Sequence, residues 1–185
     1  MPLHYALTDA LVALIAVWGA LMMWRTGRPL AALGLSLFGL AGMIGTIRIT
    51  SGLIEPLAML HKGVSQLGGL AGLALLLGHL LRGKGIRLGT GVVLGASTAL
   101  VALALALPAI GAVLFVLMLI AAIALCLQTR NHLGAAGFAV MLLNVTLVRQ
   151  SGFMGADLSW HLYHLLVATW LLCVAYGFAK APCAP

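Results

Sequence analysis

Long apolar runs, interrupted by short polar breaks, make up almost the whole chain. Charged residues, Gly and Pro end these runs at RTGRP, at Ile54-Glu55-Pro56 and at RGKGIR. Residues 88–127 form one apolar block, which as a single helix would be about 60 Å long, twice the thickness of a bilayer core. The block must therefore fold back on itself, and Pro108 supplies the break because Pro cannot continue a helix. The pattern predicts an all-α bundle of seven transmembrane helices, over residues 5–24, 30–49, 57–81, 88–107, 109–128, 133–150 and 158–180.

The composition agrees with a chain surrounded by lipid. Of its residues, 63% are hydrophobic and 7% are charged, and the mean hydropathy is +1.18. A soluble domain is nearer half apolar and a quarter charged. We therefore expect residues 1–185 to form a single membrane domain whose partner is the lipid bilayer. The net charge of +7 would suggest nucleic acid in a soluble protein, but in a membrane protein its distribution matters more, and no nucleic-acid partner is expected.

The positive charges gather on one side of the predicted membrane. The loops after the first, third and fifth spans and the C-terminal end contain no acid, and their cations are Arg25, Arg28, Arg82, Lys84, Arg87, Arg130 and Lys180. The opposite side has only Arg48, Lys62 and Arg149. Because cytoplasmic loops are rich in Lys and Arg, the first side is predicted to be cytoplasmic. The N-terminus then lies outside and the C-terminus inside, as a multi-pass protein of a bacterial inner membrane.

The remaining polar residues concentrate at the outer ends of the predicted spans. The acids and most of the histidines lie there, together with the polar end of the sixth span: Asp9, Glu55, Asp157, His4, His61, His161, His164, Asn144, Arg149 and Gln150. Polar side chains in a membrane span are costly and are usually functional. The sequence therefore predicts a site in the outer leaflet, on the periplasmic side.

The last span opens with DLSWHLYHLL, the densest polar stretch of the chain. At 100° per residue, Asp157, His161 and His164 fall within an arc of about 60° on one helix face. Trp160 and Tyr163 are typical of the aromatic residues that anchor a helix at the membrane interface. The histidine face has two interpretations: a site inside the bundle, or side chains hydrated at the headgroup level.

Two other spans bring polar side chains to the same depth. His61 and Ser65 share a helix face with Gly68 and Gly72, and small residues of this kind allow membrane helices to approach closely. A second pair of small residues, Gly42 and Gly45, leads to Arg48. Arg48 either extends outward to the interface, pairs with Asp157 or Glu55, or binds an anionic headgroup.

Three histidines from two helices are a ligand set that suits zinc. We predict His61, His161 and His164 as metal ligands, with the fourth position left for a water that the metal activates. Asp157 or Glu55 would orient a ligand imidazole or act as general base. Ser65 and Arg48 would stabilise an oxyanion, and Arg149 and Asn144 are further candidates for contacting a ligand. The predicted function is a metal-dependent hydrolase that acts on a lipid amide or ester.

The chain resembles the alkaline ceramidase-like (CREST) superfamily in three features. It has seven predicted spans, polar residues at the outer ends of the second, third and seventh spans, and a histidine pair at the start of the last span. The resemblance implies a seven-helix membrane hydrolase that holds zinc with three histidines, assisted by an aspartate and a serine. The family has H-x3-H in its last span, whereas this chain has H-x2-H at His161 and His164. The family takes its third histidine and its serine from the end of the second span, where this chain reads GTIRITSG. His61 and Ser65 would replace them from the facing helix.

Three alternatives remain open at this stage. His61 with His161 or His164 could ligate an outer haem b, and His79 with His132 an inner one. Copper is the second alternative, because Met43, Met59 and Met154 lie towards the same outer end and thioethers with imidazole suit copper. The third is a non-catalytic accessory subunit whose glycine-rich faces, such as Gly91–Gly95, pack against a membrane protein partner.

Overall fold

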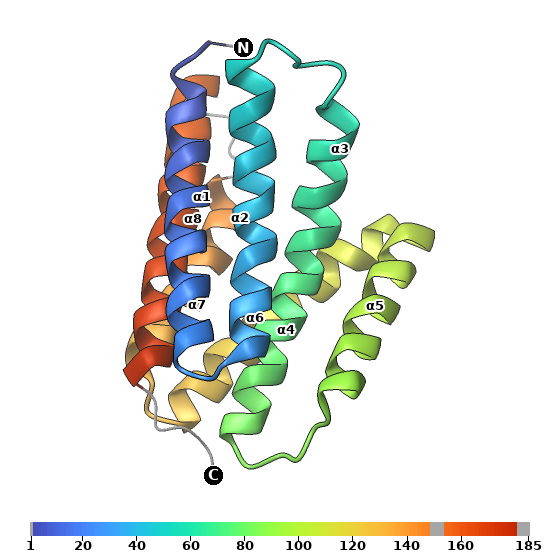
Figure 1. Cartoon of the computed structure of the whole chain (residues 1–185), viewed down its shortest axis with the longest axis vertical. Helices are drawn as coiled ribbons and strands as arrows, with labels where there is room; N and C mark the ends of the chain where they lie inside the picture. The colour runs from blue at the N-terminus through green and yellow to red at the C-terminus, as the bar shows by residue number, and fades with distance from the viewer. Residues whose placement is uncertain (1, 149–153, 181–185) are drawn as a thin grey trace.

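The computed structural model describes residues 2–148 and 154–180, which form seven helical rods packed side by side (Figure 1). The first two rods are α1 (Tyr5–Arg25) and α2 (Pro29–Thr50). The third rod is continuous from Ala58 to Gly83 and consists of α3 (Ala58–Gly63), the π-helical segment η1 (Val64–Gly68) and α4 (Gly69–Gly83). The others are α5 (Thr90–Ala106), α6 (Pro108–Gln128), α7 (His132–Leu143) with the π-helical η2 (Asn144–Val148), and α8 (Ala156–Lys180).

The all-helical prediction is confirmed in the described residues, and each predicted span corresponds to one rod. Five rods are long and apolar enough to cross a membrane: α1, α2, Ala58–Gly83, α6 and α8. The rods Thr90–Ala106 and His132–Val148 are apolar but shorter than the usual span. The last two residues of the predicted sixth span lie outside the described residues. Length and composition thus support a membrane protein with several spanning helices.

Local sequence signals explain where several rods begin and end. The apolar block divides at Pro108, as predicted: α5 ends at Ala106 and α6 begins at Pro108. Pro is favoured in the first helical turn because its missing N–H has no helical partner there. The side chain of Asn131 accepts a hydrogen bond from the Gly134 amide at 2.9 Å and caps the start of α7.

Glycines let the first three rods pack with their backbones in near contact. A Cβ on Gly42 of α2 would lie 2.8 Å from the Asp9 carbonyl oxygen and 2.9 Å from the Ala13 nitrogen, both in α1. Gly72 of α4 meets α2 in the same way, since a Cβ there would lie 2.8 Å from the Gly34 carbonyl oxygen. The predicted small-residue faces at Gly42 and Gly72 are therefore internal contacts between helices.

This close packing gives a prediction about stability. Gly42→Ala is expected to destabilise the protein by about 1–3 kcal/mol, because its methyl group meets backbone atoms that move only if α1 and α2 separate. Gly95→Ala is the matched control, since nothing lies within 4 Å of a Cβ at Gly95. Thermal unfolding of the purified variants in detergent measures the difference. If the Gly42→Ala variant were as stable as the Gly95→Ala variant, the close contact between α1 and α2 at Gly42 would not be needed for stability.

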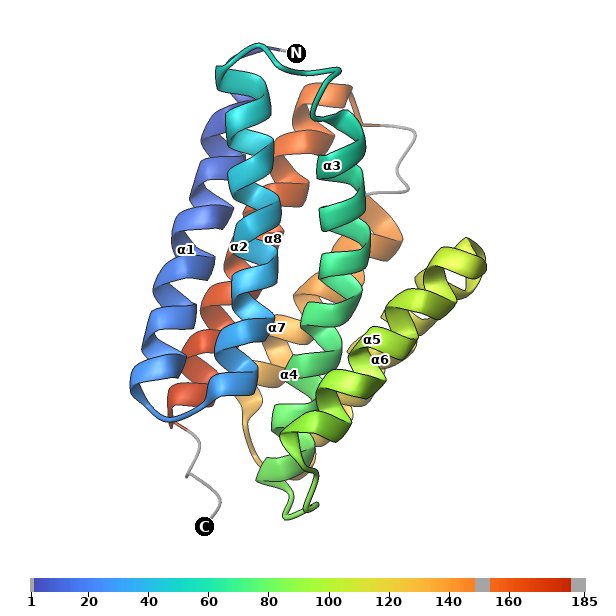
Figure 2. The same ribbon diagram turned by 45° about the vertical axis from the view of Figure 1, so that its right-hand side comes forward.

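The α5–α6 hairpin leans away from the bundle (Figure 2). The buried residues of α6 all lie in its second half, namely Met118, Leu119, Ala122 and Cys126. Its first half has no buried residue, and α5 has only three along its whole length. The bundle is therefore less tightly packed on this side, at the level where the hairpin turns.

Candidate functional site

Asp9 of α1 is the centre of the polar network inside the bundle. Its side chain is almost completely buried, at 2% exposure, and its Oδ1 lies 2.8 Å from His164 Nε2 of α8. The other carboxylate oxygen, Oδ2, is buried and has no hydrogen-bond partner in the described chain. The sequence reasoning counted Asp9 only among the outer-end acids and missed this role. An acid within an apolar helix was the signal that could have identified it.

His164 connects Asp9 of α1 to the backbone of α8. The second ring nitrogen of His164, Nδ1, lies 2.8 Å from the Trp160 carbonyl oxygen, which can only accept a hydrogen bond. Both ring nitrogens of His164 thus face oxygen atoms, Nδ1 that of the Trp160 carbonyl and Nε2 that of the Asp9 carboxyl group. The imidazole of His164 is therefore held between α1 and its own helix.

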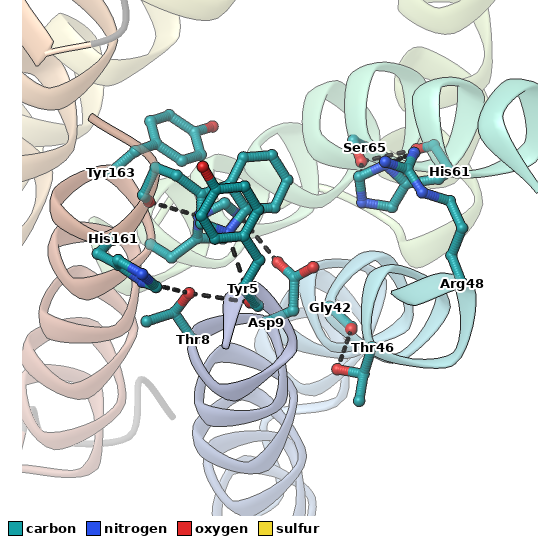
Figure 3. A network of polar contacts seen from close by, with 12 residues as sticks. Tyr5, Thr8, Asp9, Gly42, Thr46, Arg48, His61, Ser65, His161 and Tyr163 are labelled. Carbon is teal, nitrogen blue, oxygen red and sulfur yellow. Dashed lines mark hydrogen bonds and ion pairs between the residues drawn. The ribbon is translucent and has the colours of Figure 1, made fainter. Parts of the chain in front are cut away.

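His61 approaches Asp9 from the third rod. A Cβ built on Gly45 of α2 would lie 2.4 Å from Asp9 Oδ2 and 3.0 Å from His61 Nε2, so both atoms fill the space that this glycine leaves open. Arg48 Nη1 lies 3.3 Å from His61 Nδ1 (Figure 3). Because the guanidinium can only donate, His61 Nδ1 accepts, which assigns the ring hydrogen of a neutral His61 to Nε2. That N–H then lies on the side of Asp9.

Arg48 and Ser65 both contact His61. The guanidinium of Arg48 lies against the imidazole of His61, and its predicted pairing with Asp157 or Glu55 stays a prediction. The Ser65 hydroxyl donates to the His61 carbonyl oxygen at 2.6 Å and lies 3.5 Å from His61 Nε2. The hydrogen of Ser65 is thus used within its own helix.

Asp157, His161 and His164 share one face of α8, as predicted, and all three contact α1. Their partners differ, however. Asp157 accepts a hydrogen bond from the Tyr5 hydroxyl, and His161 Nδ1 lies 3.4 Å from Thr8 Oγ1. Figure 3 shows His161 beside Thr8, whose hydroxyl also donates to the Tyr5 carbonyl oxygen. The polar contacts of the three α8 side chains are therefore made to three different residues of α1.

The remaining predicted residues of the site, the catalytic candidate Glu55 and the ligand contacts Asn144 and Arg149, lie at different places along the chain. Glu55 is exposed in the connection between α2 and α3. Asn144 is fully buried at the start of η2, where its Nδ2 donates to the Tyr163 carbonyl oxygen at 2.9 Å. Arg149 lies outside the described residues. Asn144 thus ties η2 to α8.

The donor set does not fit the zinc ion that the resemblance implies. Among residues 2–148 and 154–180, no group of three His, Cys, Asp or Glu side chains is placed to hold a metal ion. His161 faces Thr8 rather than Asp9, and the Arg48 guanidinium lies against His61. A fixed cation at this distance opposes a second cation. Zinc therefore stays a prediction without support from the side-chain geometry.

The structure also shows where residues of the haem, copper and accessory-subunit predictions lie. The ring of His79 packs against Phe178, with centroids 5.0 Å apart. Met43 and Met59 are 43% and 78% exposed, so the thioethers predicted for copper lie mainly on the outer surface. Gly91 of α5 has nothing within 4 Å of a built Cβ, as at Gly95, so this glycine face is open. Haem, copper and an accessory role remain predictions.

A cavity of about 860 Å³ adjoins the Asp9 network. One wall is polar and includes Asp9, His61, Ser65, Gln66 and His164. The opposite part is apolar and extends to α6 and α7. Both π-helical segments contribute to the lining, and such segments often occur at functional sites. The site is thus a polar wall with a buried acid–base pair, joined to an apolar chamber.

No family model, curated protein or solved structure matches the chain. The resemblance to the alkaline ceramidase-like superfamily therefore stays a prediction from the sequence pattern.

Proposed function

We propose that this chain is a multi-pass protein of a bacterial inner membrane, and that it hydrolyses an amide or ester bond of a membrane lipid. The orientation proposed from the cations places the N-terminus outside. The start of α1 and the start of α8 lie at the same end of the bundle (Figure 1), so Asp9 and His164 would lie in the outer leaflet.

The observation that supports this function best is the unpartnered Oδ2 of Asp9. Leaving a buried acceptor without a hydrogen bond costs about 1–3 kcal/mol, more for a charged group. An acid in a membrane span is also retained for a functional reason as a rule. Asp9 lines a cavity of about 860 Å³ that can admit a ligand and water. Its free oxygen is therefore suited to take a proton from a reacting molecule.

The side chains around Asp9 supply the parts of a hydrolysis. A water attacks the carbonyl carbon of the lipid and gives a proton to Asp9 Oδ2, while the contact between Asp9 Oδ1 and His164 Nε2 holds the carboxyl group in position. The Nε2–H of His61 donates to the oxyanion of the tetrahedral intermediate, and Arg48 keeps that tautomer in place. The C–N or C–O bond then breaks, and the leaving nitrogen or oxygen receives the proton from Asp9. The products are a fatty acid and an amine or alcohol.

Hydrolysis by the reconstituted protein tests this function. We expect wild-type protein in phosphatidylcholine vesicles to release umbelliferone or aminocoumarin from its long-chain acyl ester or amide. In H₂¹⁸O the released acid should carry the heavy oxygen. The Asp9→Asn/His164→Gln double variant is the control, because activity of a contaminating enzyme would persist in it. No release above that control from either substrate would overturn the proposal.

A further inference from the structure

The cavity continues from the polar wall beneath the α5–α6 hairpin. Its apolar part is lined by Ala104 of α5, by Pro108, Ala112 and Phe115 of α6, and by Phe38 and Met141 on the opposite side. None of the described lining residues is Lys or Arg. Apart from Asp9 and the two histidines, the polar lining is made of uncharged groups, among them Ser65, Gln66, Thr146 and Ser159.

The hairpin is loosely attached at this level. The first half of α6, where Pro108, Ala112 and Phe115 lie, contains no buried residue, while its second half is packed into the bundle. Figure 2 shows α5 and α6 diverging from α4 towards the hairpin turn. The helix α6 is long and apolar enough to cross a membrane. The outer side of the hairpin therefore faces lipid, and its inner side faces the cavity.

We propose that the apolar chamber beneath the hairpin holds the acyl chain of a lipid with an uncharged head, whose carbonyl lies at Asp9. This inference rests on the proposed function for the bond that is cleaved. An acyl chain fits because the chamber is apolar and continuous with the acid–base group, and the cavity volume is that of a small-molecule site. A phosphate head is disfavoured because phosphate is bound by Arg and Lys side chains, and the part of the lining that the structure describes contains neither. A lipid head with hydroxyl or amide groups can instead form hydrogen bonds with the side chains of Ser65, Gln66 and Ser159.

Filling the chamber should change the chain-length preference. Ala112→Trp places an indole in the chamber, and we expect it to lower turnover of the umbelliferyl palmitate ester by about tenfold or more while leaving the butyrate ester within about twofold. Val113→Trp is the matched control, since both residues are exposed on α6 but only Ala112 lines the cavity. It should leave both rates unchanged. Equal effects of Ala112→Trp on both esters, or no effect on either, would overturn the proposal.

Photolabelling tests the chamber without any turnover. The Asp9→Asn protein is irradiated with a monoacylglycerol that carries a diazirine at the end of its acyl chain. We expect labelled peptides from residues 104–116, less label after Ala112→Trp, and less label when the same chain is carried by phosphatidic acid. Label spread evenly over the lipid-facing helices, or equal label from both lipids, would overturn the inference. If the label falls on residues 104–116 as expected but the wild-type protein hydrolyses no substrate, the proposed function is rejected and the acyl-chain site is kept.

Discussion

Asp9→Asn is expected to lower the rate of lipid hydrolysis by roughly 10²–10⁴-fold, whereas Asp157→Asn keeps it within about twofold of wild type. Asparagine preserves the shape of the Asp9 side chain but cannot accept a proton at the position of Oδ2. Asp157 is the matched control because it is a carboxylate on α8, at the same end of the bundle, whose hydrogen bond runs to Tyr5.

The same pair of variants separates two assignments of the general base. The sequence pattern favoured Asp157 or Glu55, whereas the burial and partners of Asp9 favour Asp9. Rates for a long-chain acyl ester are measured in vesicles, with thermal unfolding to show that each variant is folded. Full activity of Asp9→Asn, or a greater loss in Asp157→Asn, would contradict the assignment.

His164→Ala is expected to destabilise the protein by about 3–5 kcal/mol, because it leaves the buried carboxylate of Asp9 without its ion-pair partner. His161→Ala, one turn away on the same helix, should cost about 1 kcal/mol or less. His161 is only partly buried, and its 3.4 Å contact with Thr8 is at the long limit of a hydrogen bond. Thermal unfolding in detergent measures both changes.

A second measurement on these variants tests the zinc prediction. Elemental analysis of wild type, His161→Ala and His164→Ala should give the same low zinc content, since the three histidines do not face one site in the described chain. One zinc per wild-type chain, lost to the same extent in both variants, would restore the three-histidine site. Adding Asp9→Asn to His164→Ala should recover part of the lost stability, because the uncompensated charge is then removed.

The rods could be predicted closely because each depends on a short stretch of sequence. An apolar run must satisfy its backbone hydrogen bonds as a helix in lipid, so the runs gave the rods within a few residues of their observed ends. Pro108 divided the long apolar block for a reason that is local to that residue. The length of α5 was less certain, because the apolar run includes Leu88 before the helix and Leu107 after it.

The site could be predicted only in part. Helical periodicity was enough to put Asp157, His161 and His164 on one face. It gave no information about which neighbouring helix that face meets or at what height. That neighbour is α1, and the polar partners of these side chains in the described chain are Tyr5, Thr8 and Asp9.

The sequence by itself determined an all-helical chain with membrane-length apolar rods, an uneven distribution of charge and a cluster of polar residues near one end. These follow from residue type and spacing along a single helix. Only the tertiary structure decided that Asp9 is buried between His164 and His61, that Gly45 leaves space for both, and that a cavity connects them to the α5–α6 hairpin. The reason is that contacts between helices depend on their rotation and height relative to one another. Close approach at glycines such as Gly42 fixes both, and no pattern within one helix records them.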